Sequence, residues 1–475
     1  METQLAVIGG GPGGYAAAFL AADLGMQVVL IEADAQLGGT CLLRGCIPSK
    51  ALLHVARVIS ETKEMRDWGV GFDKPSIDVA AMRARKEKVI QTLSGGLKQL
   101  AKKRKVEVIQ ARATFENSTT LRLEATSGEL ADDVVTFEHC ILATGSVPAM
   151  PAAFKLPTDR VMDSTGALAL ADVPATLLVL GGGYIGLEMG TVYAELGSKV
   201  TVVELLPNLL TGADRDLVKP LHDRLSKIFA NIYLETKVVS LTDKGSGIEV
   251  KFEGAGGTRS ERFDRVLVSV GRRPNTAGLG LENTDVQLDD KGFVITDEQQ
   301  RTDDPHILAI GDVAGEPMLA HKATHQGKVA VEVLHGEPAA FQPAAIPAVV
   351  FTDPEIAWAG LTEEQAKLEE LQIEVTKYPW AASGRAQAIG RTEGFTKFIL
   401  EPDTDRVLGV GIVGAGAGEL LMEGVLAIEM GATVRDLVES IHPHPTLSET
   451  LGNAAEVYLG TATEIYRPRP ARKNV

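Results

Sequence analysis

The 475-residue sequence is poor in cysteine and in aromatic residues, with three cysteines and 5% Phe, Trp and Tyr. Three cysteines in a chain of this length do not make the disulfide framework of a secreted protein. The charge-free stretch 338–352 has 15 residues and contains three prolines, so it is too short and too broken to span a bilayer. We therefore expect a globular protein of the cytoplasm without a membrane partner, in which any disulfide is more often catalytic than structural.

Positive charge is scarce relative to negative charge. The sequence has 47 Lys and Arg against 63 Asp and Glu, which gives a net charge of −16. An acidic surface of this kind argues against nucleic acid or an anionic membrane as the main partner. We interpret a short basic run, KKRK at 102–105, as a solvent-facing segment.

Glycine, in contrast, is abundant, and several of the 49 glycines fall in a segment that occurs twice. The sequence LAVIGGGPGGYAAAFLAADLGMQVVLIE at 5–32 matches LLVLGGGYIGLEMGTVYAELGSKVTVVE at 177–204. Each copy predicts an apolar strand, a glycine turn, a helix and a second strand that ends in an acid. The repeat is the G-x-G-x-x-G dinucleotide fingerprint, carried by Gly9, Gly11 and Gly14 in the first copy and by Gly181, Gly183 and Gly186 in the second.

The fingerprint residues explain how such a segment binds a dinucleotide. The glycines allow a tight turn and bring the pyrophosphate to the N-terminus of the helix, where free N–H groups favour anions. Glu32 and Glu204 end the second strands and can accept hydrogen bonds from ribose hydroxyls. Because a carboxylate repels a 2′-phosphate, Glu204 favours NAD over NADP. Two such sites in one chain predict a flavin and a nicotinamide that exchange a hydride.

Three further segments predict strands that end in glycine turns. CILATGSVP at 140–148 and VLVSVGRRPN at 266–275 each follow a fingerprint, and indicate points where the chain passes between domains. TDDPHILAIGDV at 302–313 predicts a buried strand followed by Asp312, and an acid at this end of a strand fits a ligand crevice. The length favours about three domains, and the whole pattern predicts an α/β fold.

Two of the three cysteines lie in GGTCLLRGCIPSK at 38–50. Cys41 and Cys46 could bind a metal, pack in a core, form a structural disulfide or act as a redox pair. The spacing lacks the third and fourth ligands that zinc motifs supply, so we predict no metal site. Cys140 lies in an apolar strand, and we interpret it as a packed thiol.

These motifs stand in the order found in the class I pyridine nucleotide-disulfide oxidoreductases, a family of flavoproteins. Over its whole length the sequence resembles this family, and within it the dihydrolipoamide dehydrogenases. The motifs that carry the resemblance are GGGPGGY, GGTCLLRGCIPSKALLH, ATG, GGGYIGLEMG, GRRPN, AIGDV, MLAHKA and HPHPTLSE. The resemblance implies two Rossmann-like domains, for FAD and NAD, and a C-terminal α+β dimerisation domain. The implied limits are 1–147 for the first part of the FAD domain, 148–273 for the NAD domain, 274–345 for the second, central part of the FAD domain, and 346–475 for the dimerisation domain.

The resemblance also assigns roles around the cysteines. Cys41 is expected to be the interchange thiol that meets the substrate, and Cys46 the thiolate that contacts the flavin. Lys50 is expected to hold a positive charge near the flavin, with Glu188 as its acidic partner. Such a charge stabilises both a reduced flavin and the thiolate.

The segment between the two cysteines needs a special backbone. Residues five apart on a regular helix point about 140° away from each other, so a disulfide requires a distorted turn, for which Gly45 and Pro48 are suited. Here LLRG replaces the family's frequent LN-x-G, which places Leu43 and Arg44 between the cysteines. Arg44 could lower the pKa of a thiol or face solvent.

The motif HPHPTLSE supplies an acid–base pair. Thiol–disulfide exchange needs a base because only the thiolate attacks. His444 matches the family's base and Glu449 the acid that orients it, whereas we interpret His442 as supporting structure. In the family this pair reaches the flavin and disulfide of the other subunit, so the resemblance implies a homodimer with a shared active site.

The cofactor contacts implied by the resemblance can be carried over position by position. For FAD they are Gly9, Gly11, Gly14, Glu32, Gly39, Thr40, Lys50, Ala113, Thr144, Gly145, Asp312, Met318, Leu319 and Ala320. For NAD they are Gly181, Gly183, Ile185, Gly186, Glu204, Val238 and Gly271. Ala113 stands where family members often have glycine.

The implied reaction is the oxidation of protein-bound dihydrolipoamide by NAD⁺. The implied partner is a lipoyl-bearing acyltransferase core of a 2-oxoacid dehydrogenase complex, or the carrier protein of glycine cleavage. Glu204 opposes an NADPH-dependent reductase of glutathione, and the tail YRPRPARKNV lacks the cysteine pair of a mercuric reductase. Two further alternatives are disfavoured. A transhydrogenase would not need the two cysteines and His444 together, and a non-catalytic scaffold that only binds nucleotides would not need the intact set of reacting groups.

Overall fold

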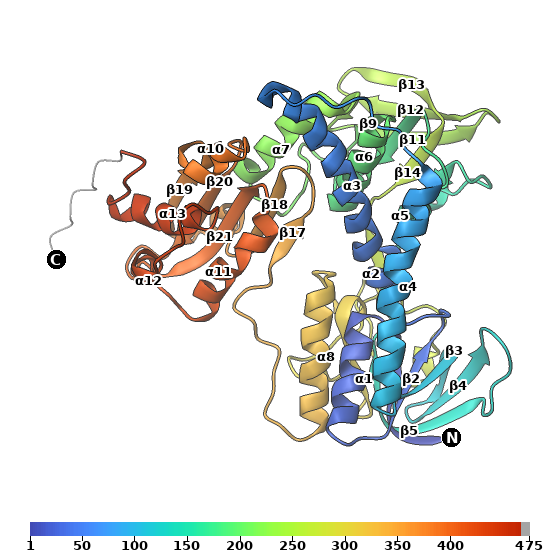
Figure 1. Cartoon of the computed structure of the whole chain (residues 1–475). Coiled ribbons are helices and arrows are strands. Elements are labelled where there is room, and N and C mark those ends of the chain that lie inside the picture. The colour runs from blue at the N-terminus through green and yellow to red at the C-terminus, as the bar shows by residue number, and fades with distance from the viewer. Residues whose placement is uncertain (467–475) are drawn as a thin grey trace.

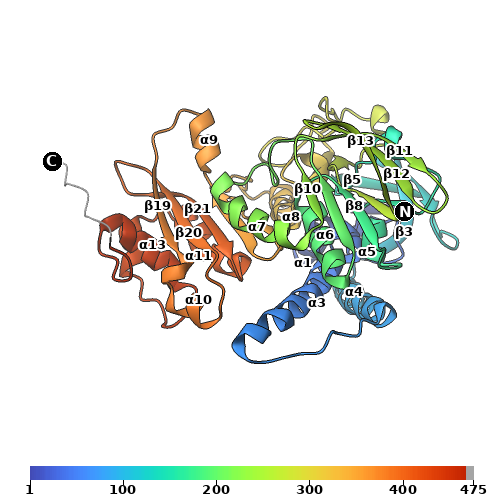
Figure 2. The ribbon, with the colours of Figure 1, turned by 90° about the horizontal axis from the view of Figure 1, so that it is seen from above.

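The structure is a computed structural model that describes residues 1–466. Residues 467–475 lie outside the described residues, and they include most of the tail whose lack of cysteine argues against a mercuric reductase. The chain forms three units, each with its own main sheet (Figure 1). Seen from above, helix α7 lies between the sheet of the third unit and the other two units (Figure 2).

The first unit contains a parallel sheet in the order β3–β2–β1–β5–β16, and β4 pairs antiparallel with both β3 and β5. Its inner strands are apolar runs such as VVLIE, as expected where helices cover a parallel sheet. Helices α1 and α8 lie side by side on this sheet (Figure 1). The elements are β1 (Glu2–Ile8), α1 (Pro12–Asp23), β2 (Val28–Glu32), α2 (Gly39–Arg44), α3 (Cys46–Glu64), α4 (Val79–Lys103), β3 (Glu107–Asn117), β4 (Thr120–Ala125), β5 (Val134–Leu142), β16 (Ile307–Ala309) and α8 (Ala320–Leu334).

The second unit repeats this arrangement. Its parallel sheet has the order β10–β9–β8–β14–β7, so the fingerprint strand β8 is central, as β1 is in the first unit. An antiparallel sheet of β11, β12 and β13 is added at its side. The elements are β7 (Val161–Met162), α5 (Ser164–Ala169), β8 (Thr176–Leu180), α6 (Tyr184–Leu196), β9 (Lys199–Val203), α7 (Arg215–Ile228), β10 (Asn231–Tyr233), β11 (Lys237–Asp243), β12 (Ile248–Gly254), β13 (Gly257–Phe263) and β14 (Arg265–Val268).

Two short strands join the first two units. β6 (Ser146–Pro148) carries the chain into the second unit, and β15 (Arg272–Pro274) brings it back. They pair antiparallel, with Ser146 opposite Pro274. The two crossings between the units therefore lie side by side.

The third unit is an antiparallel sheet in the order β17–β18–β21–β20–β19, packed with α11 and α13. Its core contains the fully buried side chains of Tyr378, Trp380 and Phe398. The predicted α/β fold with a C-terminal α+β unit is therefore confirmed. The elements are β17 (Ala348–Val350), β18 (Glu355–Gly360), α9 (Glu363–Leu368), β19 (Glu374–Pro379), α10 (Gly384–Ala388), β20 (Phe395–Leu400), β21 (Val407–Gly414), α11 (Ala417–Glu429), α12 (Val434–Glu439) and α13 (Glu449–Leu459).

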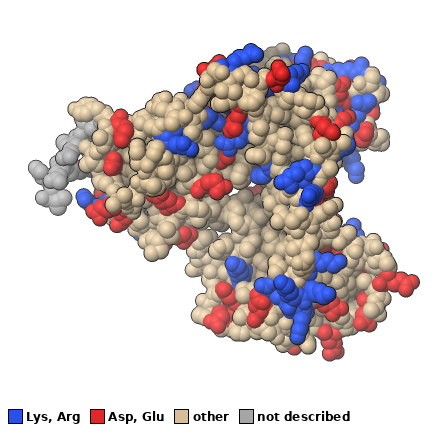
Figure 3. Space-filling view, in the orientation of Figure 1, with Lys and Arg blue, Asp and Glu red and all other residues tan. Residues whose placement is uncertain are grey.

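Basic side chains gather over the lower half of α4 (Figure 3). The run KKRK begins in the last turn of this helix, and Lys102, Lys103 and Lys105 are exposed. Arg104 pairs with Asp23 at 2.9 Å instead. The expected solvent-facing run is thus confirmed. Among the described helices, none combines the length and the apolar character needed to cross a membrane.

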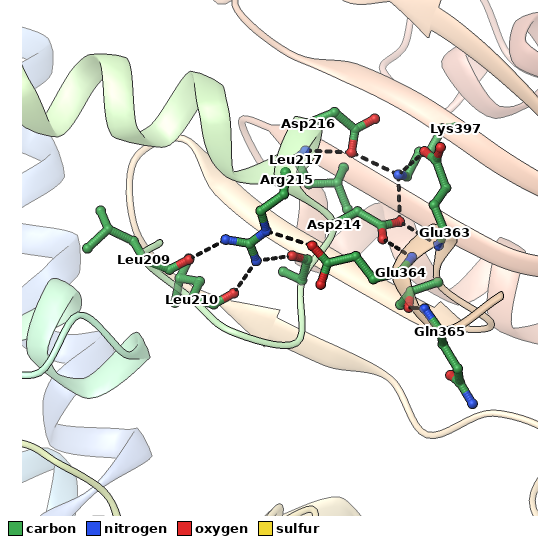
Figure 4. Close-up of polar contacts among 12 residues, drawn as sticks. Leu209, Leu210, Asp214, Arg215, Asp216, Leu217, Glu363, Glu364, Gln365 and Lys397 are labelled. Carbon is green, nitrogen blue, oxygen red and sulfur yellow. Dashed lines mark hydrogen bonds and ion pairs between the residues drawn. The ribbon is translucent and has the colours of Figure 1, made fainter. Parts of the chain in front are cut away.

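A buried cluster of charges fixes the third unit to the second (Figure 4). The Lys397 ammonium group on β20 is 1% exposed and lies 2.6 Å from Asp214, 2.8 Å from Asp216 and 2.7 Å from Glu363. Burial alone would lower the pKa of Lys397, but the three carboxylates outweigh burial and the pKa is raised. The lysine therefore stays charged and joins α7 to the third sheet.

Candidate active site

Both fingerprints form the same strand, turn and helix. Gly9 and Gly181 follow β1 and β8 with φ of +106° and +100°. A methyl group on Gly14 would lie 1.8 Å from the carbonyl oxygen of Gly9, so only glycine allows this helix so close to the turn. The first turns of α1 and α6 contain no acidic residue, and no side chain caps either helix. Their N–H groups therefore fit the pyrophosphate of a dinucleotide.

The acids at the ends of β2 and β9 are held in the same way. Glu32 accepts hydrogen bonds from the Gly10 N–H at 2.7 Å and the Asp34 N–H at 2.9 Å. Glu204 accepts two equivalent backbone bonds, at 2.6 and 2.8 Å. Burial raises the pKa of Glu32, although its N–H donors oppose the rise. Each carboxylate is thus fixed beside its glycine turn, where it fits a ribose.

Several of the expected FAD contacts meet at one edge of the first sheet. β1, β5 and β16 pair in parallel, so their carboxyl ends lie together. Gly9 follows β1, Thr144 and Gly145 follow β5, and Asp312 follows β16. The Thr144 hydroxyl donates to the carbonyl of Asn275 at 2.9 Å, which ties this edge to the chain returning from the second unit.

The other expected FAD contacts lie near the starts of two helices and in the core of the first unit. Met318 and Leu319 lead into α8, which begins at Ala320 and has no side-chain cap. Gly39 and Thr40 begin α2, and a methyl group on Gly39 would lie 2.6 Å from the Cα of Gly11. The Ala113 side chain is 6% exposed and packs in the core of the first unit, so a contact there with FAD has to come from its backbone.

The expected NAD contacts lie around α6. Ile185 and Gly186 are in its first turn, which follows Gly181 directly. Gly271 follows β14, which pairs in parallel with β8, so it reaches the same sheet edge as Gly181. Val238 lies on β11, where it packs against the core beside that sheet.

The backbone breaks between the two cysteines. α2 ends at Arg44 and α3 begins at Cys46, with Gly45 between them at φ −143° and ψ −114°. A methyl group on Gly45 would lie 2.8 Å from the Thr40 carbonyl oxygen, so a larger residue does not fit. Pro48 lies in the first turn of α3, where its missing N–H is tolerated. The expected distortion is thus a complete break between two helices.

The two thiols differ in acidity. Both are free, and the Cys41 thiol hydrogen-bonds to Cys46. This bond, followed by the charge of Lys50, lowers the pKa of Cys46 to about 7, although partial desolvation opposes the shift. The same hydrogen bond and burial raise the pKa of Cys41. Of the two thiols, Cys46, the one expected beside the flavin, therefore ionises more readily.

Lys50 joins all three units next to the cysteines. It lies one turn after Cys46 on α3, and its ammonium group donates to the two carboxylate oxygens of Glu188 at 3.0 and 2.8 Å. Glu188 lies on α6 and is 3% exposed. Phe351 of the third unit donates its N–H to Glu188 at 3.1 Å, and its ring centroid lies 4.5 Å from the lysine nitrogen. Sequence reasoning missed Phe351 because no motif marks it.

His444 and Glu449 are in direct contact. His444 Nδ1 lies 2.8 Å from Glu449 Oε1, and 78% of the His444 side chain is exposed. Burial favours a higher pKa for Glu449, but the Thr446 N–H and His444 outweigh burial, and the pKa is lowered. His442 has both ring nitrogens occupied, by the Ser440 carbonyl at 2.9 Å and by a carboxylate of α11 at 2.8 Å. It therefore has the supporting role that we expected.

Within one chain the histidine and the cysteines are apart. The segment with His444 lies between α12 and α13, and Figure 1 places these helices on the far side of the third unit from α2 and α3. Figure 2 shows the same separation between α13 and α3. Arg44, whose role was open, is partly exposed and pairs with Asp34, with one nitrogen–oxygen distance of 3.2 Å. Its guanidinium group is therefore directed at the loop after Glu32, away from the thiols.

Comparison with known proteins agrees with this geometry. Residues 3–327 match the family described as pyridine nucleotide-disulphide oxidoreductase, and residues 346–455 match its dimerisation domain. A dihydrolipoyl dehydrogenase of Vibrio cholerae is 48% identical over 474 residues, covering 100% of this chain and 99% of the relative. One of Geobacillus stearothermophilus is 42% identical over 98% of both chains.

Solved structures show the same similarity. The structure of LpdA from Mycobacterium tuberculosis is 28% identical with a TM-score of 0.88, covering 96% of this chain and 99% of that one. The HOCl-induced flavoprotein disulfide reductase RclA from Escherichia coli is 29% identical with a TM-score of 0.84, over 96% and 99%. The chain therefore belongs to the pyridine nucleotide-disulphide oxidoreductase family, and is an oxidoreductase that uses FAD and NAD(H).

Proposed function

We propose that this protein oxidises protein-bound dihydrolipoamide to lipoamide and reduces NAD⁺. The observation that carries the proposal is the thiol pair, in which a Cys46 of lowered pKa stands beside the Lys50–Glu188 ion pair. A thiol that ionises near neutral pH next to a positive charge is suited to electron transfer from sulfur. The dihydrolipoyl dehydrogenases, which this chain resembles over its full length, support the choice of substrate.

The chain's own residues carry the sulfur chemistry. His444 takes the proton of one substrate thiol, and the resulting thiolate attacks Cys41 in the Cys41–Cys46 disulfide, which releases Cys46 as a thiolate. The second substrate thiol then attacks the sulfur bound to Cys41, which releases the cyclic disulfide and leaves Cys41 as a thiol. When bound, FAD would supply the acceptor for the two electrons that are released as the Cys41–Cys46 disulfide re-forms with loss of the Cys41 proton, and the source of the hydride for NAD⁺. Each turnover thus yields lipoamide, NADH and one proton.

The cofactor contacts named from the sequence form part of this proposal. FAD is held by the first fingerprint, Glu32 and the sheet edge with Asp312, and NAD by the second fingerprint and Glu204. The uncapped N-termini of α1 and α6 and the matching backbone anchors of the two acids support these positions. We also propose the domain limits 1–147, 148–273, 274–345 and 346–475, which the pairing of β6 with β15 supports at two boundaries.

A homodimer completes the site in this proposal. In one chain the segment between α12 and α13, which carries the exposed His444, lies on the far side of the third unit from α2, so His444 of the partner subunit has to supply the base. The dimerisation domain carries an apolar stripe along α11 and its C-cap. Met422 and Leu426 of the helix and Met430 at the cap follow at intervals of four and are 57, 60 and 74% exposed. A stripe of this kind is suited to burial against a second copy. Replacing Glu449 by Gln removes the negative charge that stabilises a protonated His444, and we expect turnover to fall about 100-fold without loss of FAD.

The lipoyl group needs a carrier protein. We propose that the acidic surface docks a basic segment of an acyltransferase core or a lipoyl carrier, in accord with the net charge of −16. Binding to such a core should weaken as salt rises from 50 to 500 mM, and binding that does not change with salt contradicts this electrostatic interface.

One titration tests the activity. The holoenzyme is reduced anaerobically with NADH or with NADPH, and the loss of the flavin band is followed. We expect reduction at low NADH and little at equal NADPH, because Glu204 repels a 2′-phosphate. The Cys46→Ser variant should accept electrons from NADH but form no NADH from dihydrolipoamide. Dihydrolipoamide-dependent NADH formation by that variant refutes the mechanism.

A further inference from the structure

We propose that Ser146 and Arg272 form a positioning relay that holds the Asp312 carboxylate as a hydrogen-bond acceptor for FAD. The relay rests on the proposed contact between Asp312 and the cofactor. Its two residues lie on β6 and β15, where the chain crosses between the first and second units. Neither belongs to a glycine fingerprint.

The contacts form a continuous chain of hydrogen bonds. Arg272 Nε donates to the Ser146 hydroxyl oxygen at 2.8 Å, and Arg272 Nη2 donates to the Ser146 carbonyl at 2.7 Å. The Ser146 hydroxyl donates to Asp312 Oδ2 at 2.5 Å. Ser146 is 4% exposed, so water does not compete freely for these groups.

The chemistry of the three groups fixes the direction of the relay. A guanidinium group only donates, and a hydroxyl has a single proton. Because Arg272 donates to the Ser146 oxygen, the hydroxyl proton points to Asp312, and Oδ2 has to accept it. Within residues 1–466 the other carboxylate oxygen of Asp312, Oδ1, has no hydrogen-bond partner. The relay thus fixes the Asp312 carboxyl group through Oδ2 and leaves Oδ1 available to accept from a cofactor hydroxyl.

The relay also links the cofactor to the junction between the units. Asp312 belongs to the first unit, whereas Arg272 lies on the strand that returns from the second. Next to it, the Asn275 N–H donates to the Gly145 carbonyl at 2.9 Å, so the same crossing also contacts the glycine turn after β5. We infer that FAD affinity depends on how the two crossing strands are held together.

Reconstitution of the apoenzyme with FAD tests the relay. The dissociation constant is measured by flavin fluorescence for Ser146→Ala, Arg272→Ala, Arg272→Lys and Arg273→Ala. Arg273 is the matched control, because it is the exposed neighbour of Arg272 on β15 and pairs by its backbone with Val147. We expect dissociation constants about tenfold higher for Ser146→Ala and Arg272→Ala, an intermediate value for Arg272→Lys, and a change within about twofold for Arg273→Ala.

A double-mutant cycle with Asp312→Asn shows whether Ser146 affects FAD binding by positioning Asp312 or by stabilising the structure in general. If the relay acts through Asp312, Ser146→Ala should add little to the loss caused by Asp312→Asn. The proposal is overturned if the losses of FAD affinity from Ser146→Ala and Asp312→Asn add up in the double variant. It is also overturned if Ser146→Ala and Arg272→Ala change the dissociation constant as little as Arg273→Ala does. If Asp312→Asn leaves FAD affinity unchanged, the proposed cofactor role of Asp312 fails instead. The melting temperature of each apoenzyme shows whether a variant has lost structure rather than cofactor contacts.

Discussion

Lys397 and Lys50 each join the second unit to a neighbouring unit, but their surroundings differ. Lys397 is 1% exposed and lies within 2.8 Å of three carboxylates. The Lys50 side chain is 30% exposed and faces a single carboxylate, Glu188. Lys397 is enclosed by compensating charge, whereas Lys50 keeps a charge that acts on Cys46. The difference teaches that a lysine between units can serve either assembly or chemistry, according to how completely its charge is compensated.

The largest expected effect comes from removing the enclosed lysine. Lys397→Met leaves three carboxylates together at a buried interface, and we expect a loss of about 3–5 kcal/mol in stability, read as a lower melting temperature of the holoenzyme. Lys377→Met is the matched control, since Lys377 contacts Asp216 at 2.6 Å in the same cluster but its side chain is 42% exposed. We expect it to lose about 1 kcal/mol or less. Equal losses for the two variants contradict the distinction between them.

The second prediction concerns activity. Lys50→Met removes the positive charge next to Cys46, and we expect turnover with dihydrolipoamide to fall about 100-fold. Lys63→Met is a close control, because Lys63 pairs with Glu195 at 2.5 Å across the same two helices, α3 and α6, far along them from the cysteines. Its turnover should stay near that of the native enzyme. A similar drop in both variants would assign the effect to helix packing instead of charge.

The smallest effect is a pair of opposite pKa shifts at Cys46. In a Cys41→Ser background, the rate of alkylation of Cys46 by iodoacetamide should rise with pH as the thiolate forms. Lys50 lowers the pKa of Cys46 and Glu188 raises it, so Lys50→Met should move the midpoint up, and Glu188→Gln should move it down. Each shift should be about one unit or less. Cys140 does not interfere because it is fully buried. Shifts in the same direction would show that the pair acts on the thiol only through packing.

Local patterns made much of the site predictable. The fingerprints, Glu32, Glu204 and the cysteine segment follow from spacing along the chain, and the structure places the strands and helices where those spacings require. Contacts between distant residues could not be predicted in the same way. Phe351 and Glu188 are 163 residues apart, and Lys397 and Asp214 are 183 apart. Arg44 had two candidate roles from sequence, and its pairing with Asp34 became visible only when β2 and α2 were placed together.

The sequence by itself determined the two dinucleotide turns, because each depends on residue types at short, fixed intervals. It indicated the thiol pair and the acid–base pair through the resemblance to the family. Tertiary structure decided how those parts are charged and joined. It paired Lys50 with Glu188 and surrounded Lys397 with three carboxylates. It also placed the segment that carries His444 far from the cysteine-bearing helices of the same chain. The physical reason is that an electrostatic interaction depends on distance and burial, and both are fixed only when separate units pack against one another.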